Sequence, residues 1–169
     1  MRISIIGNCG SGKSTLATKI SQKFNIPHLH LDRLWFGGGG HLLKRDDSIG
    51  KEKVRNHVQQ QVLKFIAQED WVSDGWYKQS QVLIAERADQ LVFLDIPLYR
   101  RTINHFYRIF FSKRHPELSL WDDLKFTTQI IKRTFTHGAQ MKEFVDQYEG
   151  SVIRLRTYKE VDRFFANLR

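Results

Sequence analysis

The chain has 169 residues, of which 41% are hydrophobic, so it suits a single domain with a real core. Its one cysteine, Cys9, excludes an internal disulfide framework, and no apolar stretch approaches the ~20 residues that cross a bilayer, so we expect no membrane partner. The net charge of +9 suits polyanions such as nucleotides or nucleic acid without choosing between them. Met1 and Arg2 run straight into a predicted strand, so we expect no signal peptide and a cytoplasmic protein.

A glycine-rich segment follows the first predicted strand, residues 2–6. Residues 7–14 read Gly-Asn-Cys-Gly-Ser-Gly-Lys-Ser, the G-x-x-x-x-G-K-[ST] pattern, and a helix is predicted over residues 13–24. In this context backbone N–H groups and a helix N-terminus cradle a phosphate, Lys13 reaches the β- and γ-phosphates of ATP, and Ser14 holds Mg²⁺. The plain alternative is a glycine-rich turn with an exposed lysine. The expected nucleotide contacts are Gly7, Asn8, Gly10, Ser11, Gly12, Lys13, Ser14 and Thr15.

The middle of the chain alternates short apolar runs with helical patterns. Strand 28–31 ends at Asp32, and the four glycines 37–40 predict a mobile loop. The remaining predicted elements are helix 48–68, strand 71–75, helix 79–87, strand 91–95, helix 98–112, helices 121–136 and 139–148, strand 151–155 and helix 159–168. Five such strands separated by helices predict a three-layer α/β fold with a parallel sheet, in one domain over residues 1–169.

Acidic residues follow the second and third predicted strands, where ligands of parallel sheets bind. Asp32 can orient an acceptor hydroxyl and accept its proton, and otherwise it caps a turn. Asp74 can serve the Mg²⁺ shell or the acceptor, and otherwise it belongs to an Asp-Gly turn. Trp35 and Trp76 flank these acids and can either hold a ring of the substrate or join the core.

Basic residues gather in the second half of the chain. Arg100, Arg101 and Arg108 lie on predicted helix 98–112, where their planar side chains can stack on adenine or bind phosphate oxygens. The alternative is a solvated basic face. We expect Arg108 to take part in catalysis, Arg100 and Arg101 to bind the nucleotide, and Arg133 to bind the substrate. His28 and His30 lie two residues apart without cysteine partners, so the sequence predicts no structural zinc site.

Four segments carry a resemblance to a known family of proteins. They are Ile-Ile-Gly-Asn-Cys-Gly-Ser-Gly-Lys-Ser-Thr (5–15), His-Leu-Asp (30–32), Trp-Val-Ser-Asp-Gly (71–75) and Val-Phe-Leu-Asp-Ile-Pro (92–97). With them the chain resembles the small nucleoside-monophosphate-kinase-like P-loop proteins, and more closely the DNA topology modulation or adenylate kinase-like group. The resemblance implies an adenylate-kinase-like P-loop NTPase core with strand order 2-3-1-4-5. It also implies an acceptor-binding insert at about 33–68 and a helical lid at about 100–148.

These expectations lead to one main functional hypothesis and two others. We expect an ATP- and Mg²⁺-dependent phosphotransferase whose acceptor is a nucleotide, a nucleoside or another small metabolite. The second hypothesis is a nucleotide-binding regulator associated with DNA topology, which the basic charge permits although the chain contains no recognised DNA-reading motif. The third is an ATPase without an acceptor.

Overall fold

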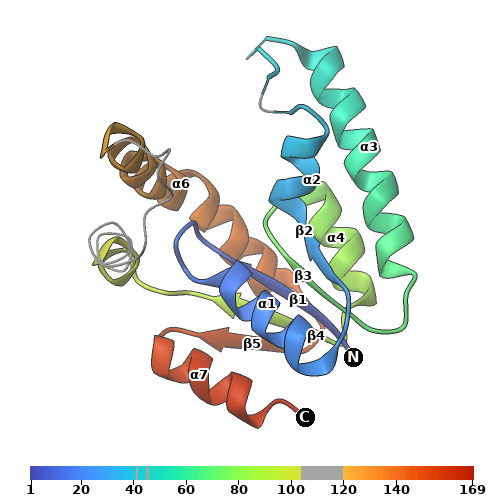
Figure 1. The fold of residues 1–169 in the computed structure, drawn as a ribbon, viewed down its shortest axis with the longest axis vertical. Coiled ribbons are helices and arrows are strands. Elements are labelled where there is room, and N and C mark those ends of the chain that lie inside the picture. The colour runs from blue at the N-terminus through green and yellow to red at the C-terminus, as the bar shows by residue number, and fades with distance from the viewer. Residues whose placement is uncertain (41, 45, 104–119) are drawn as a thin grey trace.

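A single parallel sheet organises the molecule, and helices cover both of its faces (Figure 1). The structure is a computed structural model that describes residues 1–40, 42–44, 46–103 and 120–169. The strand order is β2-β3-β1-β4-β5, which confirms the predicted order. The strands are β1 Arg2–Gly7, β2 His28–His30, β3 Trp71–Asp74, β4 Gln90–Leu94 and β5 Val152–Leu155.

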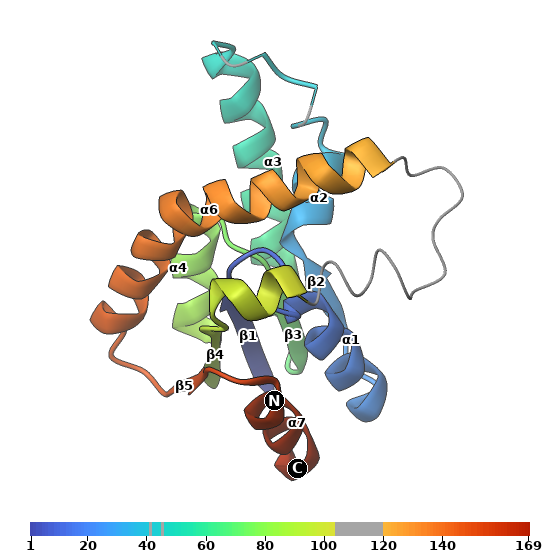
Figure 2. The same ribbon diagram turned by 90° about the vertical axis from the view of Figure 1, so that its left-hand side faces the viewer.

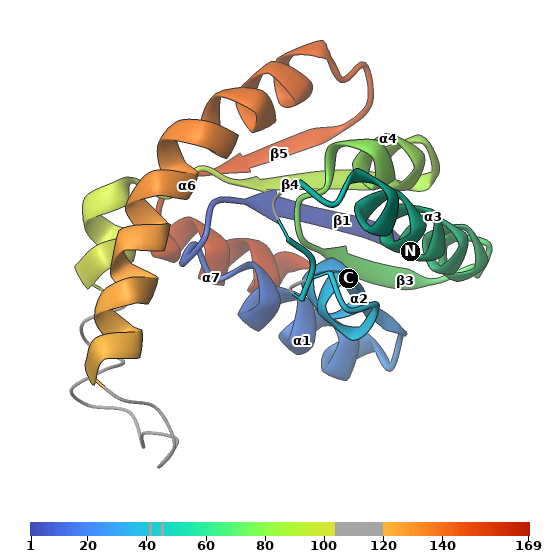
Figure 3. The same cartoon turned by 90° about the horizontal axis from the view of Figure 1, so that it is seen from above.

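The central strands are apolar because the sheet is buried on both faces. Ile3 and Ile5 pack against the first helix, whereas Ile6 packs on the other side with residues of the long helix α6. Figure 3 shows these layers, with α1 and α7 on one face and α4 and the end of α6 on the other. The helices are α1 Lys13–Phe24, α2 Leu31–Gly37, α3 Ser48–Ile66, α4 Lys78–Arg87, α6 Leu120–Gln147 and α7 Tyr158–Asn167, and residues 98–103 are also helical.

The chain after β2 differs from its prediction. The predicted strand 28–31 stops at His30, and the buried Leu31 begins the short helix α2. Gly37, predicted to open a mobile loop, is the last residue of that helix. Gly38 then caps it through a hydrogen bond from its N–H to the Leu34 carbonyl at 3.0 Å. The glycines therefore end a helix, because residues without Cβ atoms turn the chain away from the helix axis at little cost.

The two helices predicted over residues 121–136 and 139–148 are one continuous helix, α6. Gly138, which suggested a break, lies within it and is buried. A Cβ atom at Gly138 would lie 3.3 Å from Nδ2 of Asn8, so the glycine lets α6 pass close to the loop after β1 (Figure 2). Close packing, rather than a turn, accounts for this glycine. Among the described residues, no helix combines the length and apolar character that crossing a membrane requires.

Candidate functional site

The loop between β1 and α1 has the backbone geometry of a phosphate cradle. Gly7 has φ +154°, and a Cβ atom there would meet the Leu94 carbonyl oxygen at 2.7 Å and Ser11 Oγ at 2.9 Å. Gly12, the N-cap of α1, has φ +92°, a left-handed conformation that side-chain-bearing residues adopt at a cost. The loop thus turns tightly and delivers its N–H groups and the N-terminus of α1 to the same place.

Two side chains of this loop bear on whether it suits ATP. Lys13 Nζ donates to the Asn8 carbonyl at 3.2 Å, so the lysine lies over the loop. The hydroxyl of Ser11 is buried, and within the described part of the chain it has no hydrogen-bond partner. A buried hydroxyl without a partner carries a free-energy cost that an incoming phosphate oxygen can relieve. The loop therefore fits a nucleotide phosphate.

Ser14 and Asp74, both expected near Mg²⁺, lie in direct contact. The hydroxyl of Ser14 at the start of α1 donates to Oδ2 of Asp74 at the end of β3. Burial raises the pKa of the Asp74 carboxyl, but hydrogen bonds from His28 and Ser14 and the nearby histidines outweigh it, so the pKa lies below its usual value. An ionised carboxylate beside a hydroxyl is an oxygen donor set of the kind that Mg²⁺ prefers.

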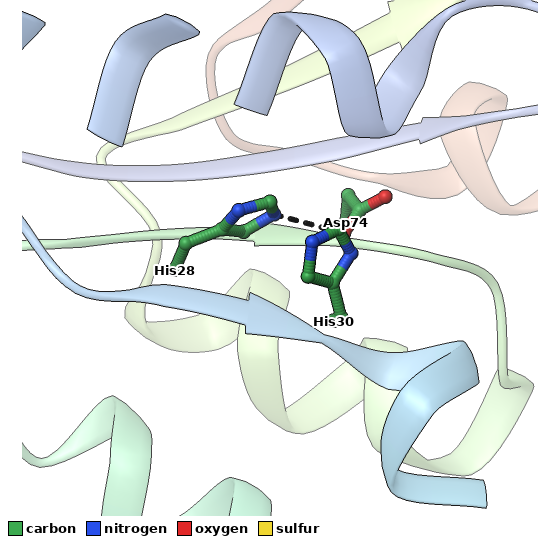
Figure 4. Close-up of side chains that lie close together, drawn as sticks. All are labelled: His28, His30 and Asp74. Carbon is green, nitrogen blue, oxygen red and sulfur yellow. Dashed lines mark hydrogen bonds and ion pairs between the residues drawn. The ribbon is translucent and has the colours of Figure 1, made fainter. Parts of the chain in front are cut away.

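Asp74 also joins two histidines of β2, as Figure 4 shows. His28 Nε2 lies 3.0 Å and His30 Nδ1 2.7 Å from the same carboxylate oxygen, Oδ1. Burial lowers the pKa of His30 more than Asp74 raises it, which favours a neutral imidazole. The sequence predicted no structural zinc site because His28 and His30 lie two residues apart without cysteine partners, and the structure places Asp74 beside both of them.

A cleft of about 530 Å³ opens beside the phosphate loop. It joins the loop to Asp32 on α2, whose Oδ1 accepts a hydrogen bond from Tyr77 at 3.2 Å. Asp95, which follows β4, forms an ion pair with Arg154, whose Nη2 lies 2.7 Å from Oδ2 of Asp95. The cleft is lined by Gly7, Asn8, Cys9, Lys13, Asp32, Trp35, Arg55, Val58, Gln59, Trp76, Tyr77, Lys78, Gln79, Ser80, His137, Gln140 and Met141.

The aromatic residues of the cleft pack against the core and also line the cleft, and their contact with a substrate ring stays a prediction. Trp35 stacks on Tyr77 with ring centroids 5.6 Å apart, and Trp76 meets Phe144 edge-on at 5.4 Å. All four residues pack against core clusters, and all but Phe144 also line the cleft. One side of each pair therefore stabilises the fold while the other can contact a ligand.

Two basic residues outside the expected site residues also reach the cleft. Arg55 on α3 is exposed, and Lys78 begins α4 directly after the aromatic pair at 76–77. Arg55 lay within a helical pattern that gave no reason to separate it from its solvated neighbours. Together they give the wall opposite the phosphate loop a positive charge.

The four arginines expected to contact nucleotide or substrate differ in their surroundings and in how far the structure describes them. Arg101 is 1% exposed and donates to the carbonyls of Ile96 and Cys9 and to Thr134 Oγ1, each at 2.9 Å, and its burial lowers the pKa of its guanidinium. Arg100 is half-buried and donates to the Tyr99 hydroxyl at 3.1 Å. Arg108 lies outside the described residues, and of Arg133 the structure describes the backbone within α6. Direct contact of these arginines with a nucleotide or substrate stays a prediction.

Comparison with solved structures places this architecture among known folds. A shikimate kinase from Bacteroides thetaiotaomicron superposes with a TM-score of 0.61 at 17% identity, over 98% of this chain and 94% of that one. The chain has the fold of shikimate kinases. A shikimate kinase from Acinetobacter baumannii, solved in complex with shikimate, superposes with a TM-score of 0.56 at 12% identity, over 99% and 95% of the two chains. No family model matches the sequence, and no curated protein sequence matches it.

Proposed function

We propose that the chain is an ATP- and Mg²⁺-dependent phosphotransferase that acts on a small, negatively charged metabolite. The observation that carries the proposal is the shared cleft, in which the phosphate loop and the carboxylate of Asp32 face one space of about 530 Å³. That volume suits a small molecule beside the end of a triphosphate. The shikimate kinase fold agrees with a P-loop kinase, and the DNA topology modulation group remains a prediction of the sequence alone.

The reaction needs positioning and charge more than covalent chemistry from the protein. An acceptor hydroxyl held at Asp32 attacks the γ-phosphorus, the bond from that phosphorus to the β–γ bridging oxygen breaks, and ADP leaves. Asp32 takes the proton of the hydroxyl. Lys13 neutralises the phosphate oxygens, while Ser14 and Asp74 would hold Mg²⁺, which supplies charge neutralisation at the β- and γ-phosphates.

The basic side chains opposite the phosphate loop support a negatively charged substrate. Arg55 and Lys78 line the cleft together with Asp32, so a carboxylate or phosphate on the acceptor would gain charge-assisted hydrogen bonds there. The same two cations suit a nucleoside monophosphate or a hydroxy acid, which share this negative group. The rings of Trp35 and Trp76 supply flat surface for the rest of the molecule.

A phosphoacceptor screen tests the proposal. Radiolabelled ATP with Mg²⁺ is offered with nucleosides, nucleoside monophosphates, sugars and hydroxy acids, and labelled products are separated. We expect transfer to an anionic acceptor, a loss of about 10²–10⁴ in kcat for Asp32→Asn, and no change for the exposed control Asp146→Asn. Release of phosphate to water at the same rate with and without every acceptor would contradict kinase activity.

Nucleotide binding is tested separately by thermal unfolding. ATP with Mg²⁺ should raise the Tm of the unmodified chain, because a ligand that binds only the folded state stabilises it. Lys13→Ala should lose this shift, and the exposed control Lys142→Ala should keep it. An equal shift in Lys13→Ala would count against the loop as the nucleotide site. Cytoplasmic location and a role in DNA topology stay predictions, the latter supported by the charge of +9 alone.

A further inference from the structure

Two histidines contact Asp74 behind the phosphate loop, and the proposed kinase reaction uses neither of them. We propose that His28, His30 and Asp74 form a binding site for a transition-metal ion of the Zn²⁺ class. The inference goes beyond the proposed kinase activity, because its ligands include two imidazoles that Mg²⁺ does not favour. Among the described residues these are the three metal-ligating side chains whose donor atoms all lie within 4.8 Å of one another.

The backbone brings the three donors together. His28 and His30 are two residues apart on β2, so their side chains leave the same face of the strand, and their ring centroids lie 3.8 Å apart. Asp74 is the direct partner of His30 on the neighbouring parallel strand β3. The donors therefore rest on two adjacent strands of the sheet, which hold them more rigidly than a loop would.

Two of the three donor separations, both to Asp74 Oδ1, are close to those of a metal centre, and all three donors lie within 4.8 Å of one another. Two ligands of a tetrahedral Zn²⁺ ion, each about 2.1 Å from the metal, lie about 3.4 Å apart. In the structure Asp74 Oδ1 lies 3.0 Å from His28 Nε2 and 2.7 Å from His30 Nδ1. An ion would replace these two hydrogen bonds and push the donors apart by about 0.5 Å, a movement within reach of small side-chain rotations.

The donor set selects the kind of ion. Two imidazole nitrogens with one carboxylate oxygen suit Zn²⁺, Co²⁺ or Ni²⁺, whereas Mg²⁺ prefers oxygen donors. Asp74 is oriented by a second contact, because its other oxygen accepts the hydroxyl proton of Ser14. His28 and His30 are 11% and 17% exposed, which leaves an approach for a small ion, while Asp74 at 3% is closed off from water.

Hydrogen bonding alone is the competing account of the cluster. A neutral imidazole can donate one proton, so each histidine can donate to Oδ1 and hold Asp74 for Ser14 without any metal. The two accounts assign different partners to Oδ1 of Asp74. In the metal account Oδ1 coordinates the ion while Oδ2 still accepts the Ser14 hydrogen bond, and in the other account Oδ1 accepts hydrogen bonds from the histidines. Metal binding measured without nucleotide therefore separates them, and it does so whether or not the chain proves to be a kinase.

The test uses the full chain, free of affinity tag and stripped of metal with a chelator. Co²⁺ is titrated in while visible absorption and binding heat are followed. We expect one ion per chain with the strong absorption of a low-symmetry, four- or five-coordinate site. Affinity should fall at least ~10-fold in His28→Ala and in His30→Ala, because each loses a ligand. The control His57→Ala, an exposed histidine of α3, should match the unmodified chain.

Three results would overturn the site: no uptake of Co²⁺ or Zn²⁺ by the unmodified chain, equal affinity in the two site variants and the control, or full displacement of Co²⁺ by Mg²⁺ in moderate excess. Displacement by Mg²⁺ would mean that the ion sits among oxygen donors at Ser14. X-ray absorption of the Zn²⁺-loaded unmodified chain provides a measurement independent of the folding of any variant. It should show two imidazole ligands, and a shell without imidazole would also overturn the proposal.

Discussion

The two walls of the cleft are built in different ways. The phosphate loop is held through its own main chain: the side chains of Lys13 and Arg101 donate to the carbonyls of Asn8 and Cys9, and α6 passes close to the Asn8 side chain at Gly138. The opposite wall, formed by α2, α3 and the start of α4, presents side chains such as Asp32, Arg55 and Lys78. One wall is defined by backbone shape and the other by exposed functional groups.

This difference separates what is common to a fold from what is particular to one protein. Phosphate is the same in every nucleotide, so a fixed backbone cradle suffices to bind it. The acceptor differs from enzyme to enzyme, and its recognition depends on a few polar groups placed in a cleft. Substitutions in the first wall should therefore cost folding stability, and substitutions in the second should cost activity while leaving stability nearly unchanged.

The largest loss of stability is expected at Gly7. In Gly7→Ala the new methyl group meets the Leu94 carbonyl at 2.7 Å in a backbone conformation that alanine adopts poorly, so we expect about 2–4 kcal/mol of destabilisation in urea unfolding. The matched control is Gly37→Ala at the end of α2, where a Cβ meets nothing within 4 Å. It should be neutral or stabilising by up to ~1 kcal/mol. Equal changes in the free energy of unfolding for Gly7→Ala and Gly37→Ala would contradict the expected difference between the two positions.

The next effect concerns Arg101. Arg101→Met keeps much of the side-chain volume but leaves the Ile96 and Cys9 carbonyls without their buried donor, so we expect a loss of about 2–3 kcal/mol in unfolding free energy. Arg100→Met, which breaks the contact with Tyr99, should change stability little. If Arg101→Met unfolds like the control, the buried arginine does not brace the loop, and direct contact with nucleotide becomes the better account.

A smaller effect, confined to activity, is expected on the other wall. Arg55→Gln should raise KM for an anionic acceptor about 10-fold, because the acceptor loses a charge-assisted hydrogen bond worth about 1.4 kcal/mol. The urea midpoint should stay the same, since Arg55 is exposed. Arg87→Gln, an exposed arginine at the far end of α4, serves as control. A change in KM for ATP but not for the acceptor would reassign Arg55 to the nucleotide.

The smallest effect lies at the amino ends of the inner strands β1 and β4, away from both walls. Hydrogen bonds from the Arg2 guanidinium lower the pKa of Asp89. Because the pKa of Asp89 is lower in the folded state, the Arg2–Asp89 pair adds to the free energy of unfolding in full above the unfolded-state pKa of about 3.9. This contribution is lost as the pH falls through the folded-state pKa. Asp89→Asn should therefore lower the Tm slightly at pH 6, and this difference should shrink as the pH falls below about 3.9. A larger decrease in Tm in acid than at pH 6 would contradict this direction of the pH dependence.

Sequence predicted the first wall better than the second. The G-x-x-x-x-G-K-[ST] pattern and the buried strand before it determine a local backbone path, so Gly7, Gly12 and Ser14 could be placed from a few neighbouring residues. The contact of Ser14 with Asp74 follows from the strand order, which places β3 beside β1. Local pattern and sheet topology together were sufficient for this part of the site.

Predictions that depended on distant packing fared worse. A glycine between two predicted helices is compatible with a break, and the close approach of Asn8 accounts for Gly138 inside the continuous helix α6. Arg55 resembles any solvated helical arginine until α3 is placed beside the cleft. The contacts of His28 and His30 with Asp74 join residues more than forty positions apart along the chain, so the spacing of the histidines could not predict them. In each case the deciding partner is close in space and remote in sequence.

The buried guanidinium of Arg101 has a mechanical consequence. It donates hydrogen bonds to the Cys9 carbonyl in the phosphate loop and to Thr134 Oγ1 in α6, so it links the phosphate loop to this helix. Relative movement of the loop and α6 near Thr134 would break these two hydrogen bonds. If the cleft narrows around bound reactants, we therefore expect α2 and α3 to move rather than the phosphate loop or α6.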